Sequence, residues 1–234
     1  MELFNTALFS DANLLSYYRL EDITDSKGSA DLTNYGTVAF NVGKYNNGAD
    51  FETPNSSRFL RNTSLLGTTA TADRTIVGWI KPTANPGNGT RNDFIYFGYA
   101  GNKRGYYLGY SNTGGSYYLH GGGFRDYVAD YLVNFASGVV IDWVHLALTY
   151  SGTALEFFVN GVSKGTTSMP SGDGNTGNTA EDGISIGRFV SFAPNYANGL
   201  IDDVAIFDRV LTAAEILTLV EETPTDPGLF DFNG

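Results

Sequence analysis

Apolar and polar positions alternate along much of the chain with the two-residue period of β-strands. Residues 14–20 form an aromatic and aliphatic run before a polar stretch, and residues 75–81 are rich in β-branched side chains. Proline cannot donate a ladder hydrogen bond, so Pro82 ends the second run before a loop over residues 83–90. These patterns predict short strands joined by turns.

The clearest pattern is a pair of apolar runs joined by a short glycine loop. The runs cover residues 143–150 and 155–159, and Asn160-Gly161 follows the second of them. Asn-Gly favours a type I′ turn, which connects two antiparallel strands directly. We therefore predict a three-stranded antiparallel meander in this part of the chain.

One short helix is predicted near the C-terminus. Thr212 and Glu215 have the spacing of a capping box, and residues 216–220 then supply a short apolar face. Proline and glycine interrupt the pattern soon afterwards, and the sequence contains no internal repeat. The prediction is one domain over residues 1–222, followed by a linker and tail over residues 223–234.

The composition supports an all-β fold large enough to have a core without disulfides. The 234 residues include 29 glycines and 33 aromatic residues, whereas only 17% are charged. Aromatic side chains pack well on pleated surfaces, and glycine supplies the positive φ angles of tight turns. The absence of cysteine excludes disulfides and thiolate metal sites.

The net charge of −11 argues against nucleic acid and membrane surfaces as partners, because both are anionic. The first residues lack the basic and apolar regions of a signal peptide, and no apolar run is long enough for a membrane helix. We therefore expect an extracellular location or the surface of a particle such as a phage. In the first case, the chain would be a module of a longer secreted protein.

Several short motifs, in their order along the chain, resemble laminin-G-like jelly rolls of the concanavalin-A-like type and the related pentraxins. The matching stretches are YYRLE at residues 17–21, DSKG at 25–28, NGADFE at 47–52, GWIKP at 78–82, the hairpin at 143–161, and GLIDDV with LTAAEI at 199–216. The resemblance implies a two-sheet antiparallel jelly-roll sandwich with one short C-terminal helix. A fold of this kind hosts many functions, so the function has to be sought in particular residues.

The resemblance also implies a structural calcium ion, which such jelly rolls often hold between their first strand and a late strand. The matching carboxylates are Glu21, Asp25, Asp202 and Asp203, with Asp22 in reserve. Asp202 shares strand parity with Val204 and Ile206, which predicts that it points inward. The alternative is that Asp202 pairs with a cation such as Arg19 or ends a strand.

Two other calcium sites are not supported by the sequence. Residues 170–182 are rich in glycine and aspartate, but they lack the EF-hand glycine and glutamate and are predicted to form a plain loop. Pentraxins bind phosphocholine through calcium held by carboxylates. Residues 103–104 and Arg188 place cations at the corresponding positions here.

Tyrosines concentrated in residues 94–131 suggest a platform for sugar rings. Alternation places Tyr106 and Tyr110 on one face of a strand and Tyr107 and Gly109 on the other. Sugars need a flat apolar surface with hydrogen-bonding groups at its rim. The candidate ligand-binding residues are Tyr106, Tyr110, Tyr117, Arg104, His120 and Arg125. The alternative is that most of these rings belong to the core.

The sequence carries no recognisable catalytic pattern. It lacks the alternating E-x-D-x-E carboxylates of glycosidases with this fold, the G-x-S-x-G elbow and a phosphate-binding glycine loop. His145 lies within a structural hairpin motif, and two histidines cannot form a three-histidine zinc site. We predict a non-catalytic carbohydrate-binding or adhesion module. The alternative is a structural or decoration protein of a phage or other particle, which would bind neighbouring protein chains.

Overall fold

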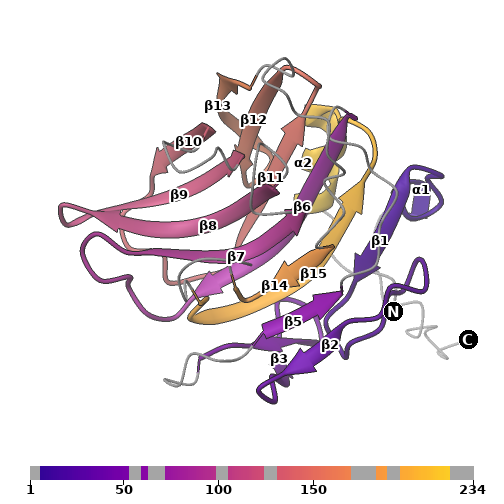
Figure 1. Ribbon diagram of the computed structural model, residues 1–234, viewed down its shortest axis with the longest axis horizontal. Coiled ribbons are helices and arrows are strands. Elements are labelled where there is room, and N and C mark those ends of the chain that lie inside the picture. Colours follow the sequence, from indigo (N-terminus) through magenta and orange to yellow (C-terminus); the bar gives the residue numbers. More distant parts are fainter. Residues whose placement is uncertain are drawn as a thin grey trace, which may run out of the picture.

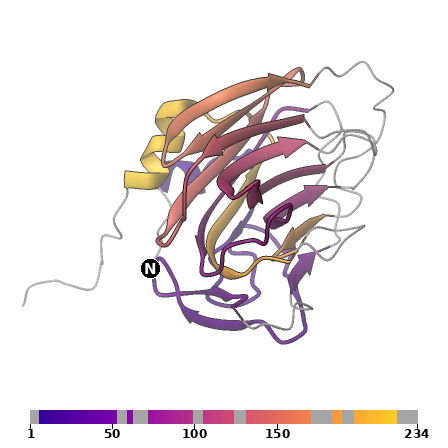
Figure 2. The same cartoon turned by 90° about the vertical axis from the view of Figure 1, so that its left-hand side faces the viewer.

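Two antiparallel β-sheets stacked as layers form most of the computed structural model (Figure 1, Figure 2). The structure describes residues 6–52, 59–62, 72–98, 105–123, 131–169, 183–188 and 196–221. The predicted loop at 170–182, the predicted tail at 223–234, Arg104 and Arg125 lie outside these residues. The domain boundary at residue 222 therefore stays a prediction, whereas the predicted antiparallel sandwich is confirmed.

The first sheet, called sheet A, has eight strands within the described residues. Their order is β13 (Val162–Ser168), β12 (Ala154–Val159), β11 (Val144–Tyr150), β6 (Arg74–Pro82), β15 (Gly199–Phe207), β4 (Asn47–Asp50) and β3 (Ala39–Val42), and β1 (Leu14–Tyr18) also pairs with β15. The late strand β15 is central, because it pairs with β6 along one side and with β1 and β4 along the other.

The second sheet, called sheet B, has seven strands within the described residues. Their order is β10 (Tyr131–Ala136), β9 (Ser116–Gly123), β8 (Gly105–Thr113), β7 (Arg91–Gly98), β14 (Ile184–Ile186), β5 (Phe59–Asn62) and β2 (Thr33–Tyr35). Consecutive strands β7 to β10 form a meander, and β14 joins it to the early strands β5 and β2.

The main core lies between the two sheets. Sheet A contributes inward-facing residues such as Ile76, Leu146 and Phe157, and sheet B contributes Ile95, Leu108 and others, all buried. The alternate positions of each strand face outward, as the period-two pattern requires. The face of sheet B turned away from this core is called the outer face below.

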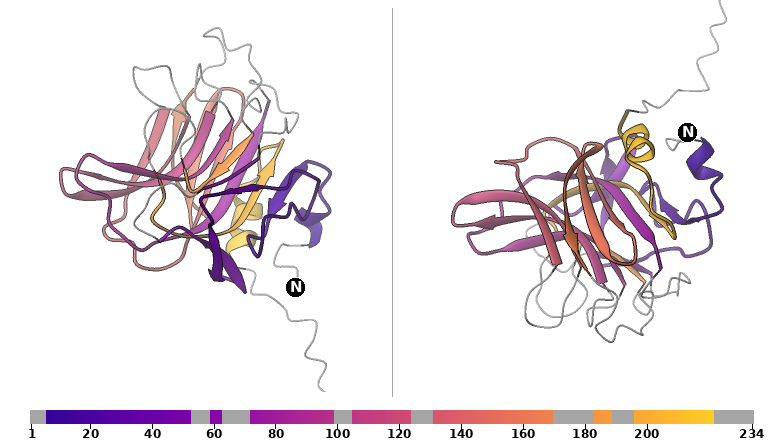
Figure 3. Two further views of the ribbon diagram at one scale, coloured as in Figure 1. Left: turned by 60° about the horizontal axis from the view of Figure 1, so that its bottom comes forward. Right: turned by 90° about the horizontal axis from the view of Figure 1, so that it is seen from above.

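A second apolar cluster covers the opposite side of sheet A. Tyr17, Val77 and Phe207 face α2 (Ala213–Glu221) and the segment that contains α1 (Thr6–Phe9). Both helices lie on the same side of the molecule (Figure 3). No helix within the described residues is both long and apolar enough to cross a bilayer.

The predicted meander and capping box are both confirmed. Strands β11, β12 and β13 pair in succession, and Asn160 and Gly161 adopt the positive φ angles of 48° and 76° at their turn. At α2 the Glu215 amide donates to Thr212 Oγ1 (3.2 Å), while the Thr212 amide donates to Glu215 Oε2 (2.7 Å). These reciprocal bonds satisfy amides that a helix start leaves without partners.

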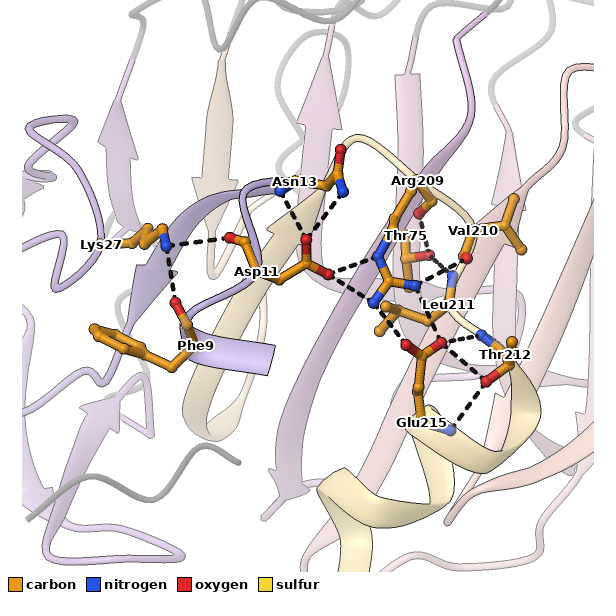
Figure 4. A network of polar contacts seen from close by, with 10 residues as sticks. All are labelled: Phe9, Asp11, Asn13, Lys27, Thr75, Arg209, Val210, Leu211, Thr212 and Glu215. Atoms are coloured by element: carbon orange, nitrogen blue, oxygen red, sulfur yellow. Dashed lines mark hydrogen bonds and ion pairs between the residues drawn. The ribbon is translucent and has the colours of Figure 1, made fainter. Parts of the chain in front are cut away.

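Arg209 ties this helix start to the beginning of the chain (Figure 4). Its Nε donates to Asp11 Oδ2 (2.6 Å), and its terminal nitrogens donate to both Glu215 carboxylate oxygens (2.6 and 3.0 Å). Lys27 Nζ adds bonds to the carbonyls of Phe9 and Asp11. Segments almost 200 positions apart are thus held by one charged network.

We expect Arg209→Ala to lower the free energy of unfolding by about 1–2 kcal/mol at pH 7, since water screens this partly exposed cluster. The hydrogen bonds from Arg209 lower the pKa of Glu215 to about 2. Because the pKa of Glu215 is lower in the folded protein than in the unfolded chain, its charge stabilises the fold above about pH 4.5, and this stabilisation is lost as pH falls toward 2. The difference in stability between the wild type and Arg209→Ala should therefore shrink between about pH 4.5 and 2. Urea unfolding across this range measures it. Glu215→Gln keeps the cap and should cost less; an equal cost would contradict this account.

Candidate functional site

Strand alternation sorts the tyrosines of β8 onto two faces, and the predicted platform lies on the wrong one. Tyr106 and Tyr110 point between the sheets and are 1% and 0% exposed. The Arg74 guanidinium lies over the Tyr106 ring, and the Tyr110 hydroxyl accepts a bond from the Val140 amide. The prediction that these two rings form an exposed sugar platform is therefore wrong. The alternation was predicted correctly, but the face of β8 that carries Tyr106, Leu108 and Tyr110 is the one that packs into the main core.

Tyr117 is half-buried and contributes mainly to packing. Its ring stacks on Tyr110 with centroids 5.8 Å apart, and it packs against the main core. Asn112 on β8 donates from Nδ2 to the Pro86 carbonyl and so anchors a loop. Of the predicted binding residues that the structure describes, only His120 lies on the outer face of sheet B.

His120 belongs to a buried polar cluster on that outer face. Its Nε2 lies 3.5 Å from Asp93 Oδ1, and Arg91 Nε lies 3.1 Å from the same oxygen. Gly109 stands between the two in the sheet, paired with Asp93 on one side and His120 on the other. A Cβ at Gly109 would collide with the His120 ring and lie 2.6 Å from the Asn92 carbonyl oxygen. Glycine therefore creates the space through which histidine reaches aspartate.

Tyr107 links this cluster to the aromatic residues of the outer face. The Arg91 guanidinium lies 4.4 Å from the Tyr107 ring centroid, and the His120 ring meets Tyr107 edge-on at 5.8 Å. Tyr96, opposite Tyr107 on β7, stacks with it in nearly parallel planes. Tyr96, Tyr107, Asp93 and His120 are all 0% exposed, so they form a buried floor beneath Arg91.

Partly exposed residues surround this floor. Arg91, Ser111 and Tyr118 are cross-strand neighbours in one row and are half-buried, while Asn134 beside His120 is exposed. Hydroxyl, amide and guanidinium groups next to aromatic rings are the donor and acceptor set that a sugar requires. We call these residues and the floor beneath them the outer-face cluster.

Sequence reasoning missed Arg91 and Asp93, because they precede the tyrosine-rich block. An available signal was their i, i+2 spacing on a strand, which places both side chains on one face. The other signal was Gly109, since glycine inside a strand often marks close approach by another group. The other histidine, His145, is buried in sheet A against Trp79, and burial lowers its pKa to about 3.

The predicted calcium ligands are only partly brought together. A β-bulge between Asp202 and Ala205 breaks the expected parity, so Asp202 does not point into the main core. Its Oδ2 accepts the Tyr45 amide (3.0 Å) and its Oδ1 accepts the Asp203 amide (2.9 Å). The inward orientation predicted for Asp202 is therefore wrong, and backbone amides satisfy much of its carboxylate.

Asp203 is buried beside Asp202 and has a positive φ of 47°. It accepts a 2.6 Å hydrogen bond from the Tyr17 hydroxyl. Burial raises the pKa of both aspartates, and the neighbouring Asp203 charge raises that of Asp202 further. Glu21 also raises the pKa of Asp203, which indicates that these carboxylates are neighbours.

Glu21 and Asp25 have partners of their own. Glu21 pairs with Arg19 (3.3 Å), whereas Asp25 accepts the amides of Tyr17 and Lys27 (both 3.0 Å). Within the part of the chain that the structure describes, no group of three or more His, Cys, Asp or Glu side chains could hold a metal ion. The four predicted ligands thus do not form one calcium cage in this arrangement.

We expect Asp203→Asn to make the protein more stable at pH 8, by on the order of 1 kcal/mol. Asparagine keeps an acceptor for Tyr17 and tolerates positive φ, but removes the charge beside Asp202. The pKa of Asp203 is higher in the folded protein than its ordinary value near 3.8, so ionising this group favours the unfolded chain. The wild type therefore loses stability as pH rises above about 3.8. The advantage should therefore disappear by about pH 4. Urea unfolding at pH 4, 6 and 8 tests this, and an advantage that grows on acidification would contradict it.

The family of the chain follows from its sequence match. A laminin G family model, described as the concanavalin A-like lectin/glucanases superfamily, matches residues 46–217. The chain belongs to this superfamily. The match includes β4 to β15 and the start of α2, and therefore most strands of both sheets and the whole outer-face cluster, whereas β1, β2 and β3 precede it. A search of curated proteins found no match.

Solved structures with the same fold include a domain of an arabinanase and the binding domains of botulinum neurotoxins. Domain 4 of AbnA, a GH43 extracellular arabinanase from Geobacillus stearothermophilus solved with arabinotriose, has a TM-score of 0.66 and 20% identity. The match covers 91% of this chain and 100% of that domain. The binding domain of botulinum neurotoxin DC, solved with SialylT, has a TM-score of 0.69 and 14% identity over 89% of this chain.

The match to the toxin domain covers 51% of its length, so this chain spans about half of it. The same holds for botulinum neurotoxin type C, whose cell entry depends on interaction with two ganglioside molecules. Its structure has 14% identity and a TM-score of 0.69, and the match covers 92% of this chain and 52% of that one. At these identities the likeness establishes a common fold.

Proposed function

We propose that the protein is a non-catalytic carbohydrate-binding module, and that it binds glycans through the outer-face cluster of sheet B. The observation that supports this most is a group of partly exposed polar and aromatic residues on neighbouring strands, Arg91, Ser111, Tyr118 and Asn134. The buried Asp93 and Tyr107 beneath them hold the Arg91 guanidinium in place. Hydrogen-bonding groups in fixed positions next to aromatic rings suit the alternating polar and apolar surfaces of a sugar.

The comparisons support the same class of ligand. A domain covered over its full length was solved with arabinotriose, so we take arabino-oligosaccharides as the first glycans to test. Extracellular action, as a module or on a particle surface, fits such a ligand. We assign no catalytic role to Asp93 or His120, because Arg91 and Gly109 hold them in a buried, hydrogen-bonded arrangement.

The test is a glycan array followed by calorimetry with the purified chain. We expect saturable binding to one glycan class, weakened about tenfold or more by Arg91→Gln or by Tyr118→Ala, since tenfold corresponds to about 1.4 kcal/mol. Lys81→Gln removes the same charge from sheet A and should leave affinity within about twofold. Binding that both outer-face variants leave unchanged would place the site elsewhere.

Calcium stays a prediction for Glu21, Asp25, Asp202 and Asp203. Thermal unfolding and glycan binding measured with calcium and with EDTA test it directly. A bound ion should raise the unfolding temperature of the wild type but raise that of Asp203→Asn less. Equal unfolding temperatures in calcium and EDTA would count against the ion.

A second candidate is a structural protein of a phage or other particle that contacts neighbouring protein chains. It is favoured by a hollow of about 260 Å³ lined by Pro82, Thr83, Ala84, Asn85, Val139, Val140 and Ile141. Val139 and Ile141 are 52% and 77% exposed there. Absence of glycan binding, together with self-assembly that Ile141→Ser reduces, would favour this candidate over the first.

A further inference from the structure

A stack of aromatic rings lies at the end of sheet B opposite β10. Tyr35 on β2 and Phe59 on β5 are directly opposed across the strands, and their rings stack with centroids 4.5 Å apart and planes 8° apart. Tyr35 is 43% exposed, so the stack reaches the surface. It thus presents to the solvent an aromatic side chain whose position is fixed by a neighbouring ring.

Arg188 extends this stack. Its guanidinium lies 4.9 Å from the Phe59 ring centroid and 5.4 Å from that of Tyr196. An antiparallel β-bridge between Arg188 and Tyr196 fixes their backbones relative to each other. A guanidinium held against two rings has its plane fixed, so it loses little further freedom when it binds a ligand.

The charge of Arg188 is not matched by a carboxylate within the described residues, and its Nε is buried without a hydrogen-bond acceptor. Arg19, Arg91 and Arg209 all have carboxylate partners. Within the described part of the chain, Arg188 therefore differs from these three arginines. Its planar N–H groups are suited to a carboxylate that comes from outside the chain.

We infer that this stack is a subsite for a carboxylate-bearing sugar of the uronic acid class. Arg188 would bind the carboxylate through two parallel hydrogen bonds, while the exposed Tyr35 ring supports the apolar face of a sugar. Arg61, which follows Phe59 by two residues and therefore shares its face of β5, adds positive charge to the same side. This inference rests on the proposed glycan binding and specifies one class of glycan.

The experiment compares a charged and a neutral form of one sugar backbone, an oligogalacturonate and its methyl ester, by calorimetry with the full chain. We expect the wild type to bind the acid about tenfold or more tightly than the ester, as charge-assisted hydrogen bonds imply. Arg188→Gln should reduce this ratio to about two or less, and Lys81→Gln should leave it unchanged. Arg188→Lys keeps the charge without the planar fork and should restore only part of the ratio.

A further variant keeps the test decisive if Arg188→Gln folds poorly. Tyr35→Ala removes an exposed ring and should weaken acid and ester alike, with the ratio unchanged. Equal wild-type affinity for both probes, or a full preference in folded Arg188→Gln, would overturn the acidic subsite and leave neutral glycan binding standing. Failure to bind any glycan on the array, acidic or neutral, would instead overturn the proposed function and this inference with it.

Discussion

Gly199→Ala should lower the free energy of unfolding by about 3 kcal/mol or more. Gly199 opens the central strand β15 with a φ of 148°, a conformation that L side chains rarely adopt. A Cβ there would collide with the Lys81 carbonyl oxygen and lie 2.9 Å from the Pro82 Cα. Both obstacles are backbone of the paired strand β6, which cannot move aside without breaking the sheet.

Urea unfolding of this variant beside Gly138→Ala provides the control. Gly138 also has a positive φ, 66°, but a Cβ there would meet no atom within 4 Å. That substitution carries only the conformational cost of about 1 kcal/mol. Similar losses for the two variants would show that the clash with β6 contributes nothing.

Phe157→Ala should cost about 3–5 kcal/mol, the range observed when large aromatic residues are truncated in cores. Phe157 is fully buried, and its ring packs on the backbone of Gly121 in the opposite sheet. A Cβ at Gly121 would lie 2.5 Å from Phe157 Cδ2 and 3.0 Å from Leu148 Cδ1. The ring therefore fills space that glycine leaves open, and its removal creates a cavity.

A double-mutant cycle with Gly121→Ala measures this complementarity. Gly121→Ala alone should destabilise, because its methyl group collides with the Phe157 ring. In the Phe157→Ala background the same methyl group enters the cavity and should cost much less. Additive costs would show that the two positions do not share a packing site.

The sequence predicted the architecture well, because architecture depends on local patterns that repeat. The β11–β12–β13 meander follows from alternation and from Asn160-Gly161, and α2 begins at the capping box of Thr212 and Glu215. Each of these signals acts within a few residues. The sandwich itself was expected from the order of short family-like motifs.

The site was predicted less well, because its residues meet across strands. Alternation separated Tyr106 from Tyr107 but could not say which face would meet the other sheet. The link from Asp93 to His120 depends on the register of three strands and on the space above Gly109. Asp202 was misplaced for a related reason, since a β-bulge shifts parity without an obvious sequence signal.

The central position of β15 also determines how the domain can be made. During synthesis from the ribosome, β1, β4 and β6 emerge early, but the strand that joins them arrives only with residues 199–207. Until then these strands have unpaired edges, which readily pair with other chains. Folding must therefore wait for the last fifth of the chain, and a nascent or truncated chain without β15 is an aggregation hazard that a cell has to shield.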